Sequence, residues 1–159
     1  MPGDIRAKER AIVTLTTTGA SLTNSSAGLG NQTVDFDARS TGNAADDLQA
    51  QFELICQWAT ITSIVKDTTA ADLYLIPVLD GTNVPDVDTT AGTSALPYTA
   101  FVGSFVCVKA PTANTNMRFI TPVIDISPRL YKPYILNRAG QTITANWSLK
   151  VVSDQAQYT

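Results

Sequence analysis

The sequence predicts an all-β fold, an antiparallel, jelly-roll-like β-sandwich with an extended N-terminal arm. Threonine occurs 22 times among the 159 residues, whereas glutamate occurs twice and lysine five times. Threonine suits a pleated surface because its branched Cβ restricts χ1, whereas glutamate and lysine fill exposed helix faces. Apolar residues alternate with polar ones in several short segments, and no long segment has a convincing helical period. About seven or eight such strands pack as two sheets.

The chain divides into a polar arm, residues 1–10, and a single sandwich domain, residues 11–159. A length of 159 residues fits one domain, and the sequence contains no internal repeat. Segments dense in Ser, Asn, Gly or Pro are expected to be loops, as at 21–30, 39–47 and 82–97. The expected strands cover residues 11–18, 31–36, 51–58, 72–79, 98–109, 117–126, 130–136 and 142–151.

Residues 51–58 fit two periods. A helical stripe runs through positions 48, 52, 55 and 59, whereas a strand places four large residues on one face. A β-branched run follows at 61–65, which favours the strand. The four residues expected on the buried face are Phe52, Leu54, Cys56 and Trp58.

Glycine and proline mark the irregular positions. Gly103 lacks a side chain in the middle of a strand, which indicates a bend or a close contact. Pro122 indicates an edge position or a bulge. Gly140 suits the left-handed residue of a tight turn. This turn is expected to join strand 130–136 to strand 142–151 as an antiparallel pair.

The composition excludes several function classes. The chain has no histidine, so the commonest general base, the usual His-activated nucleophiles and His-containing metal sites are absent. The net charge is −3, and the 11 Lys and Arg residues form no basic patch for nucleic acid. The longest apolar runs, near 73–79 and 101–108, are shorter than the roughly 18 to 20 residues of a membrane-spanning helix. We therefore expect no enzyme activity, cofactor or metal, and neither nucleic acid nor membrane as partner.

The predicted exterior suits permanent packing against other subunits. Only 16% of the residues are charged, against about 25% in a typical soluble domain, so Thr, Ala, Asn and Ser fill much of the surface. Such short side chains lose little rotamer entropy when a neighbour covers them. An ordinary threonine-rich monomer is the alternative. No secretory h-region occurs in the first ten residues, so synthesis and retention in a cytoplasm are expected.

Acidic residues and cysteines offer three candidate sites. Asp35 and Asp37 share a strand face, as glycosidase carboxylates could, but no sequence neighbour favours such chemistry. Cys56 and Cys107 lack a metal-type spacing and are expected to be buried free thiols. A third group carries oxygen ligands suited to calcium, but its glycine stands second rather than sixth, unlike an EF-hand, which favours a solvated turn. This group comprises Asp80, Asn83, Asp86 and Asp88.

Aromatic residues offer a fourth candidate, a sugar-stacking platform on one face of the sandwich. Trp58 and Trp147 both fall on the apolar faces of their strands, which favours core packing instead. The five aromatic residues considered for a platform are Trp58, Trp147, Tyr98, Tyr131 and Tyr134.

Two segments resemble tailed-bacteriophage virion proteins of the jelly-roll type. They are ADLYLIPVLDGTN at 71–83 and RLYKPYILNRAGQ at 129–141, the second followed by the Trp147 strand. In those proteins a Leu-Tyr-Leu strand with an Asp-Gly turn comes mid-chain, and a late hairpin carries an Asn-x-x-Gly turn. The resemblance covers roughly residues 50–152 and carries over no catalytic residue.

The resemblance implies a non-enzymatic structural virion protein, assembled in the host cytoplasm. We expect a capsid decoration or cement protein that binds across major capsid subunits, as a homotrimer because capsid lattices have local three-fold positions. The alternatives are a tail, baseplate or fibre component, or a carbohydrate-binding or receptor-binding β-sandwich module.

The arm at residues 1–10 is the candidate attachment site. It either frays, as termini of isolated domains do, or becomes ordered on a neighbouring subunit. For a virion subunit we predict docking on a partner, with deletion of the arm leaving the fold intact but preventing incorporation into particles. The predicted interface residues are Ile5, Arg6, Lys8 and Arg10.

Overall fold

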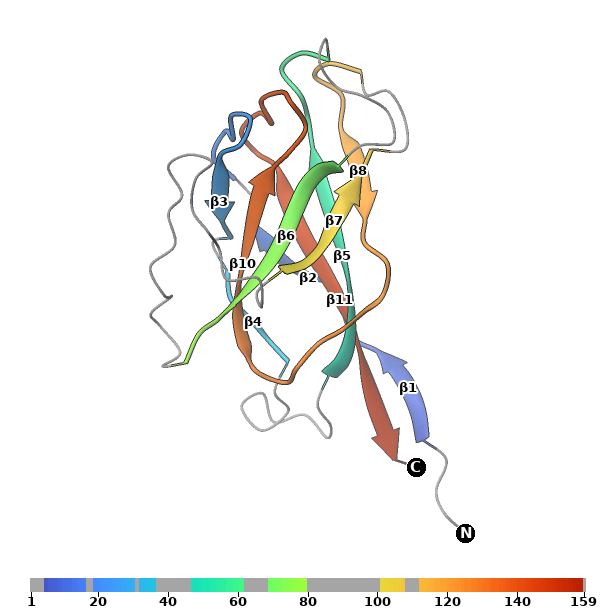
Figure 1. The fold of residues 1–159 in the computed structure, drawn as a ribbon. Helices are drawn as coiled ribbons and strands as arrows, with labels where there is room; N and C mark the ends of the chain where they lie inside the picture. Colours follow the sequence, from blue (N-terminus) through green and yellow to red (C-terminus); the bar gives the residue numbers. More distant parts are fainter. Residues whose placement is uncertain are drawn as a thin grey trace.

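The described part of the chain is built of β-strands, as predicted. Eleven strands form two antiparallel sheets, one of six strands and one of five, which face each other (Figure 1). Within that part of the chain, the structure has no helix of the length and apolarity needed to cross a membrane. The computed structural model describes residues 5–16, 19–30, 32–36, 47–61, 69–79, 101–107 and 112–158.

The two sheets draw their strands from all parts of the sequence. The strands of the larger sheet follow the order β1 (Ile5–Glu9), β11 (Ser148–Tyr158), β5 (Asp47–Cys56) and β8 (Met117–Ile120), with β2 (Val13–Thr16) paired to β11 and β9 (Ile124–Asp125) paired to β5. The strands of the smaller sheet follow the order β3 (Ala27–Leu29), β10 (Leu130–Asn137), β6 (Thr69–Pro77) and β7 (Phe101–Val106), with β4 (Val34–Asp35) paired to β10.

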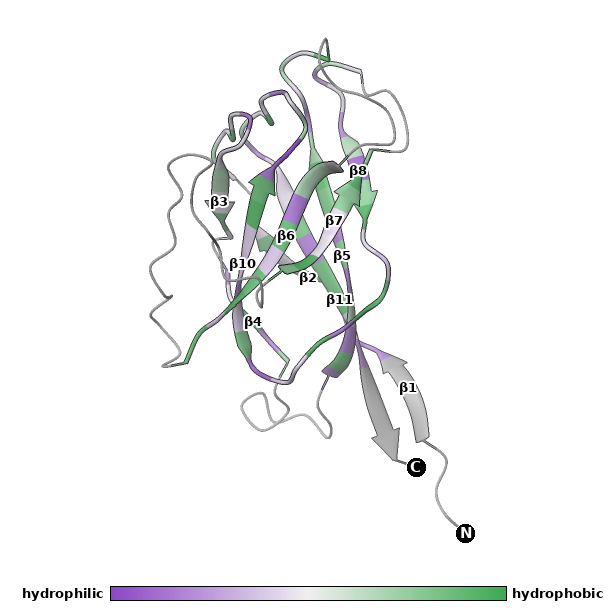
Figure 2. Cartoon of the chain, in the orientation of Figure 1, coloured by the Kyte–Doolittle hydropathy of each residue, from purple (hydrophilic) through white to green (hydrophobic). Residues whose placement is uncertain are grey.

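The core lies between the sheets, and β5 contributes to it as a strand rather than a helix. The alternation that favoured a strand is confirmed, because Phe52, Leu54, Cys56 and the following Trp58 are all buried. Hydrophobic residues recur along the central strands of both sheets, with polar residues between them (Figure 2). The ring of Phe119 on β8 meets Trp58 edge to face at 5.3 Å.

Trp147 is a core residue, as expected, and the chain makes room for it. Its indole Nε1 donates a hydrogen bond of 2.8 Å to the carbonyl oxygen of Ala20. A Cβ at Gly19 would lie 2.0 Å from the indole ring, so only glycine permits this approach. The indole therefore packs directly against the backbone that follows β2.

The predicted pairing of the last strand is wrong. The expected strand 142–151 does not pair with 130–136, because β10 and β11 belong to different sheets. Asn146 has φ 70°, which interrupts the extended backbone just before β11 starts at Ser148. Ile143 instead forms isolated bridges with Leu22 and Trp58. The predicted buried face is correct for Ile143, Trp147, Leu149 and Val151, which are all buried, but wrong for Ala145, which is exposed beside the interruption at Asn146.

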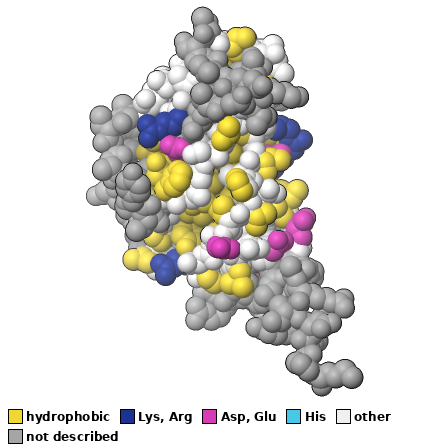
Figure 3. All heavy atoms as spheres, turned by 45° about the vertical axis from the view of Figure 1, so that its right-hand side comes forward, with side chains coloured by type: hydrophobic (Ala, Val, Ile, Leu, Met, Phe, Trp, Pro, Cys, Tyr) yellow, Lys and Arg dark blue, Asp and Glu magenta, His cyan; other side chains and the backbone are white. Residues whose placement is uncertain are grey.

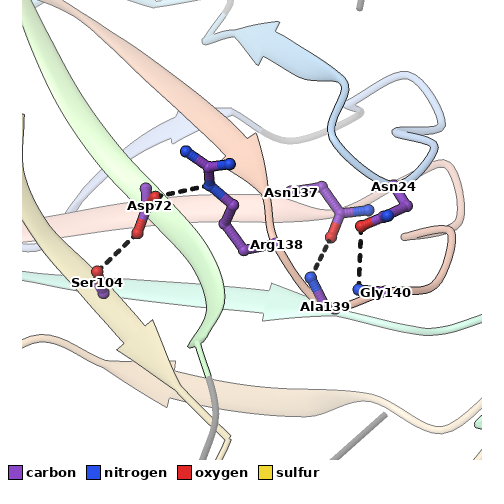
Figure 4. Close-up of polar contacts among 7 residues, drawn as sticks. All are labelled: Asn24, Asp72, Ser104, Asn137, Arg138, Ala139 and Gly140. Carbon is purple, nitrogen blue, oxygen red and sulfur yellow. Dashed lines mark hydrogen bonds and ion pairs between the residues drawn. The ribbon is translucent and has the colours of Figure 1, made fainter. Parts of the chain in front are cut away.

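The turn after β10 has the predicted left-handed glycine, Gly140 at φ 74°. Buried Asn137 organises this turn by donating from Nδ2 to the carbonyl oxygens of Leu22, Thr23 and Gln141 at 2.9, 3.1 and 2.7 Å. Its Oδ1 accepts the Ala139 N–H at 2.9 Å (Figure 4). One amide thus satisfies four backbone groups where the chain leaves the smaller sheet.

Proline and glycine positions give a mixed outcome. Pro122 lies in the break between β8 and β9, on the edge side of β5, as expected. Gly103 has open space around its Cβ position, so the predicted close contact is wrong, while a register shift beside it fits the predicted bend. Pro133 stands within β10, opposite the gap between β3 and β4, where its carbonyl accepts the Gly30 N–H at 2.8 Å. Proline has no N–H, so at this position it can only accept a hydrogen bond.

One expected loop contains a strand, and other predicted segments lie outside the described residues. The stretch 21–30 was expected to be loop but contains β3. The expected loops 39–46 and 82–97 lie outside the described residues, as does most of 61–65.

Candidate interaction surfaces

The N-terminal arm is extended, and part of it is a strand of the larger sheet. Residues of β1 pair with the end of β11 in a continuous register from Ile5 opposite Tyr158 to Glu9 opposite Asp154. Pairing of β11 with β5 ends where Gln155 meets Asp47. The pairs that Ile5, Arg6 and Ala7 make with the end of β11 therefore form a two-stranded ribbon, which projects beyond the sandwich (Figure 1).

An ion pair between partly exposed Arg10 and buried Asp47 lies at the root of this ribbon. The Arg10 guanidinium donates to Asp47 Oδ2, and the Asp47 side chain is completely buried. The Ser153 hydroxyl donates to the same oxygen at 2.8 Å, while the Arg10 N–H donates to the Ser153 carbonyl oxygen at 2.8 Å. Arg10, Asp47 and Ser153 are called the root cluster below.

The root cluster bears on the expected effect of deleting residues 1–10 but not on the predicted partner contacts of the arm. Deleting residues 1–10 would remove the partner of a buried carboxylate, so the fold is no longer expected to survive that deletion intact. Arg10 is engaged within its own chain. The role of Ile5, Arg6 and Lys8 in a partner interface stays a prediction.

A groove crosses the outer face of the larger sheet, away from the core. It holds about 180 Å³ of space. Ile12, before β2, and Ile120, on β8, border it and are 67% and 57% exposed. The floor of this groove is formed by residues of β5, β8 and β11, namely Gln51, Phe52, Glu53, Arg118, Lys150, Val151 and Val152.

Three charged residues meet in the groove. Arg118 donates to Glu53 Oε1 from Nε at 2.8 Å and from Nη2 at 2.7 Å, while Lys150 Nζ lies 4.0 Å from Glu53 Oε2. The pKa of Arg118 is raised by its hydrogen bonding to Glu53 and by the negative charge of Glu53. The side chains of Arg118, Lys150 and Glu53 are 64%, 33% and 19% exposed. This groove cluster therefore carries one negative and two positive charges within reach of solvent.

Aliphatic and aromatic side chains are also exposed where the edges of the two sheets lie side by side. Figure 3 looks toward the β7 and β8 side and shows hydrophobic groups gathered over its centre, with basic and acidic groups toward the borders. Phe101 and Val106 on β7 are each 45% exposed, and Val123 after β8 is 54% exposed.

A polar network adjoins the exposed ring of Phe101 on the smaller sheet. Asp72 accepts hydrogen bonds from the Ser104 hydroxyl at 2.6 Å and from Arg138 Nε at 3.0 Å (Figure 4). These contacts with Asp72 raise the pKa of Arg138. The Tyr74 ring meets Phe101 at 5.5 Å, edge to face.

The described residues do not assemble the aromatic platform that was considered as an alternative to core packing. Trp58, Trp147 and Tyr134 are buried, which confirms the two tryptophans as core residues. Tyr131 is half-buried and packs against Phe36 at 6.0 Å. Tyr98 lies outside the described residues.

The other candidate sites gain little support. The oxygen group of Asp80, Asn83, Asp86 and Asp88 lies outside the described residues, as does Asp37. Among the residues that the structure describes, no three His, Cys, Asp or Glu side chains come together as metal ligands.

Cys56 and Cys107 are both buried thiols, as predicted. Burial raises the pKa of the Cys56 thiol from 9.0 to about 12, and the nearby charge of ionised Cys107 acts in the same direction. A thiol with so high a pKa is a poor nucleophile at neutral pH, because the thiolate is the reactive form.

The groove could not be predicted from the sequence pattern. Arg118 and Ile120 alternate along β8 with buried Phe119, so their outward direction could be predicted from the period of two. Their meeting with Glu53 and Lys150 depends on which strands are neighbours, which the period does not give.

Comparisons with known proteins give distant likenesses only. No family model matches the chain, and no curated protein matches its sequence. The CBM36-1 domain of a multidomain xylanase from the hindgut metagenome of Trinervitermes trinervoides has 12% identity and a TM-score of 0.47, covering 91% of this chain and 96% of that chain. The C-terminal CBM6 of LamC, a marine laminarinase from Zobellia galactanivorans, has 10% identity and a TM-score of 0.44, covering 93% and 98%. The structure of Cocksfoot mottle virus has 10% identity and a TM-score of 0.33, covering 97% of each chain.

Proposed function

We propose that the chain is a non-enzymatic structural subunit of a tailed-phage virion, a capsid decoration or cement protein that binds across major capsid subunits. The observation that carries the proposal is the uncovered aliphatic surface of the groove, bordered by Ile12 and Ile120. Covering apolar surface contributes roughly 25 cal/mol per Å², and short or branched side chains lose little entropy in doing so. A homotrimer and a virion location stay predictions of this proposal, with a tail, baseplate or fibre component as its variant.

Binding to particles tests the proposal. Purified chain is added to particles assembled without it, and bound protein is measured by quantitative mass spectrometry. Ile120→Asp is expected to reduce binding at least about tenfold, since it puts a charge in the covered surface. Leu79→Asp is the matched control, because Leu79 is 87% exposed and outside the groove. Absence of wild-type binding would overturn the virion role, and unchanged binding of Ile120→Asp would exclude the groove as the contact.

Deleting residues 1–9 instead of 1–10 tests whether the N-terminal ribbon contacts a partner. Removing residues 1–9 keeps Arg10 and its ion pair with Asp47. If Ile5, Arg6 and Lys8 dock on a partner, this variant stays folded and loses particle binding. Normal binding of the folded variant would remove the arm from the interface.

Glycan binding is the second candidate function. The exposed Phe101 ring favours it, because an aromatic face beside the Asp72 and Arg138 pair offers both stacking and hydrogen bonding to a sugar. Screening against a glycan array, followed by calorimetry, tests it with Phe101→Ala. Val106→Ala is the control on the same strand with equal exposure. Binding that survives Phe101→Ala would exclude this site.

A further inference from the structure

The groove has a shape and a charge that narrow the choice of occupant. Its volume of about 180 Å³ is room for a side chain and a stretch of backbone. A helix is about 10 to 12 Å wide with its side chains, so it could enter this space only with single side chains and not with its backbone. An extended segment fits it better.

The apolar borders determine one feature of that segment. Ile12 and Ile120 stand more than half exposed, and Val152 lies beside them in the same groove. An aliphatic side chain placed in the groove would cover part of this apolar border and remove it from water. A small inorganic anion could not make this contact.

The charges determine a second feature. Glu53 is held by both Nε and Nη2 of Arg118, whereas the Lys150 ammonium lies 4.0 Å away, too far for a hydrogen bond to Glu53. The groove cluster has a net charge of one positive unit, counted from Glu53, Arg118 and Lys150. A carboxylate on the occupant would meet Lys150 without competing for the Arg118 contacts.

The same charges disfavour a second copy of the chain packed on this face by two-fold symmetry. Two-fold packing of this face on itself would bring two clusters of equal positive charge together, which is destabilising. We propose that the groove binds an extended segment of a different protein, in which an aliphatic residue stands next to a carboxylate. This inference rests on the proposed structural role and names the chemistry of the partner surface.

Titration of the full-length chain with two synthetic peptides tests the inference. Both are blocked hexapeptides with a central leucine, followed by aspartate in one and lysine in the other. Amide resonances of the ¹⁵N-labelled protein are followed by NMR. The aspartate peptide is expected to shift residues of the groove floor and to bind about tenfold more tightly than the lysine peptide.

Two variants separate the two features. Ile120→Ser is expected to abolish the shifts, whereas the matched control Leu79→Ser keeps them. Lys150→Gln is expected to reduce the preference for aspartate severalfold while leaving leucine-dependent binding. Equal affinity for both peptides, or shifts located outside the groove, would overturn the inference.

The outcome is independent of the particle experiment. Particle binding without a peptide preference would contradict only the partner chemistry proposed here. A clear aspartate preference without any particle binding would contradict only the virion role.

Discussion

The root cluster and the groove cluster both use a carboxylate of β5, Asp47 at its start and Glu53 further along, yet water reaches these two carboxylates differently. The Asp47 side chain is completely buried, whereas the Glu53 side chain is 19% exposed beside Arg118 and Lys150, which are 64% and 33% exposed. A buried charge that loses its partner pays a large desolvation cost, whereas an exposed pair is screened by water. The root cluster therefore stabilises the fold, whereas the charges of the groove cluster remain available to another molecule.

Breaking the root cluster has the largest expected effect. Arg10→Met leaves the Asp47 carboxylate buried without its cation, which is expected to lower the free energy of unfolding by about 3 to 5 kcal/mol. Urea denaturation followed by tryptophan fluorescence measures the loss. A loss below about 1 kcal/mol would show that Asp47 is not the structural anchor assigned to it.

Asn137, a buried polar residue without charge, tests whether the charge of Asp47 accounts for the expected loss of stability. Asn137 is as buried as Asp47 and makes four hydrogen bonds, all to the backbone. Asn137→Ala is expected to cost about 2 to 3 kcal/mol, less than Arg10→Met, because unsatisfied neutral groups are desolvated more cheaply than a charge. The same urea experiment ranks the two variants, and the reverse order would contradict the argument from charge.

The partners of Arg10 and Asn137 could not be predicted from the sequence. Arg10 and Asp47 are 37 positions apart, and Asn137 reaches Leu22 across 115 positions. The hydrophobic period identified the buried faces of β5 and β11 correctly, because alternation alone decides which face meets the core. It does not decide which strand lies beside which. Polar partners on distant strands were therefore not predicted.

The misplaced hairpin has the same cause. A tight turn at Gly140 is real, but the chain then crosses to the other sheet, and Leu149 pairs with Leu54 instead of with β10. Two consecutive strands joined by a short turn usually pair, so the local signal pointed the wrong way. The groove could not be predicted for the same reason, because its charged residues lie on three different strands, β5, β8 and β11.

Burial of an ionisable thiol provides a third test, through pH. The pKa of Cys56 is raised from 9.0 to about 12, so above pH 9 the unfolded chain loses a proton that the folded chain retains. The resulting stability is complete below about pH 9 and is lost at about 1.4 kcal/mol per pH unit as the pH rises toward 12. The difference in unfolding free energy between wild type and Cys56→Ala isolates this effect. A difference that stays constant across this range would contradict it.

Replacing the whole root cluster should cost far less than breaking it. The triple variant Arg10→Met, Asp47→Leu and Ser153→Ala leaves no charge and no hydroxyl unsatisfied in the cluster. Buried ion pairs exchanged for apolar groups are often neutral in stability, so we expect a free energy of unfolding within about 1 kcal/mol of wild type. A loss as large as that of Arg10→Met alone would indicate that the ion pair stabilises the fold directly. The urea midpoint and slope of both variants decide between these outcomes.

The smallest effect is expected at the groove cluster. Arg118→Gln removes both hydrogen bonds to Glu53, but Glu53 remains in contact with water and near Lys150, so the urea midpoint should stay at the wild-type value. The same variant lowers the positive charge of the groove and should weaken binding of the aspartate peptide. A folded-state role for Arg118 would appear instead as a lower urea midpoint with unchanged peptide affinity. Because the two measurements move independently, this variant separates a charge kept for stability from a charge kept for contact.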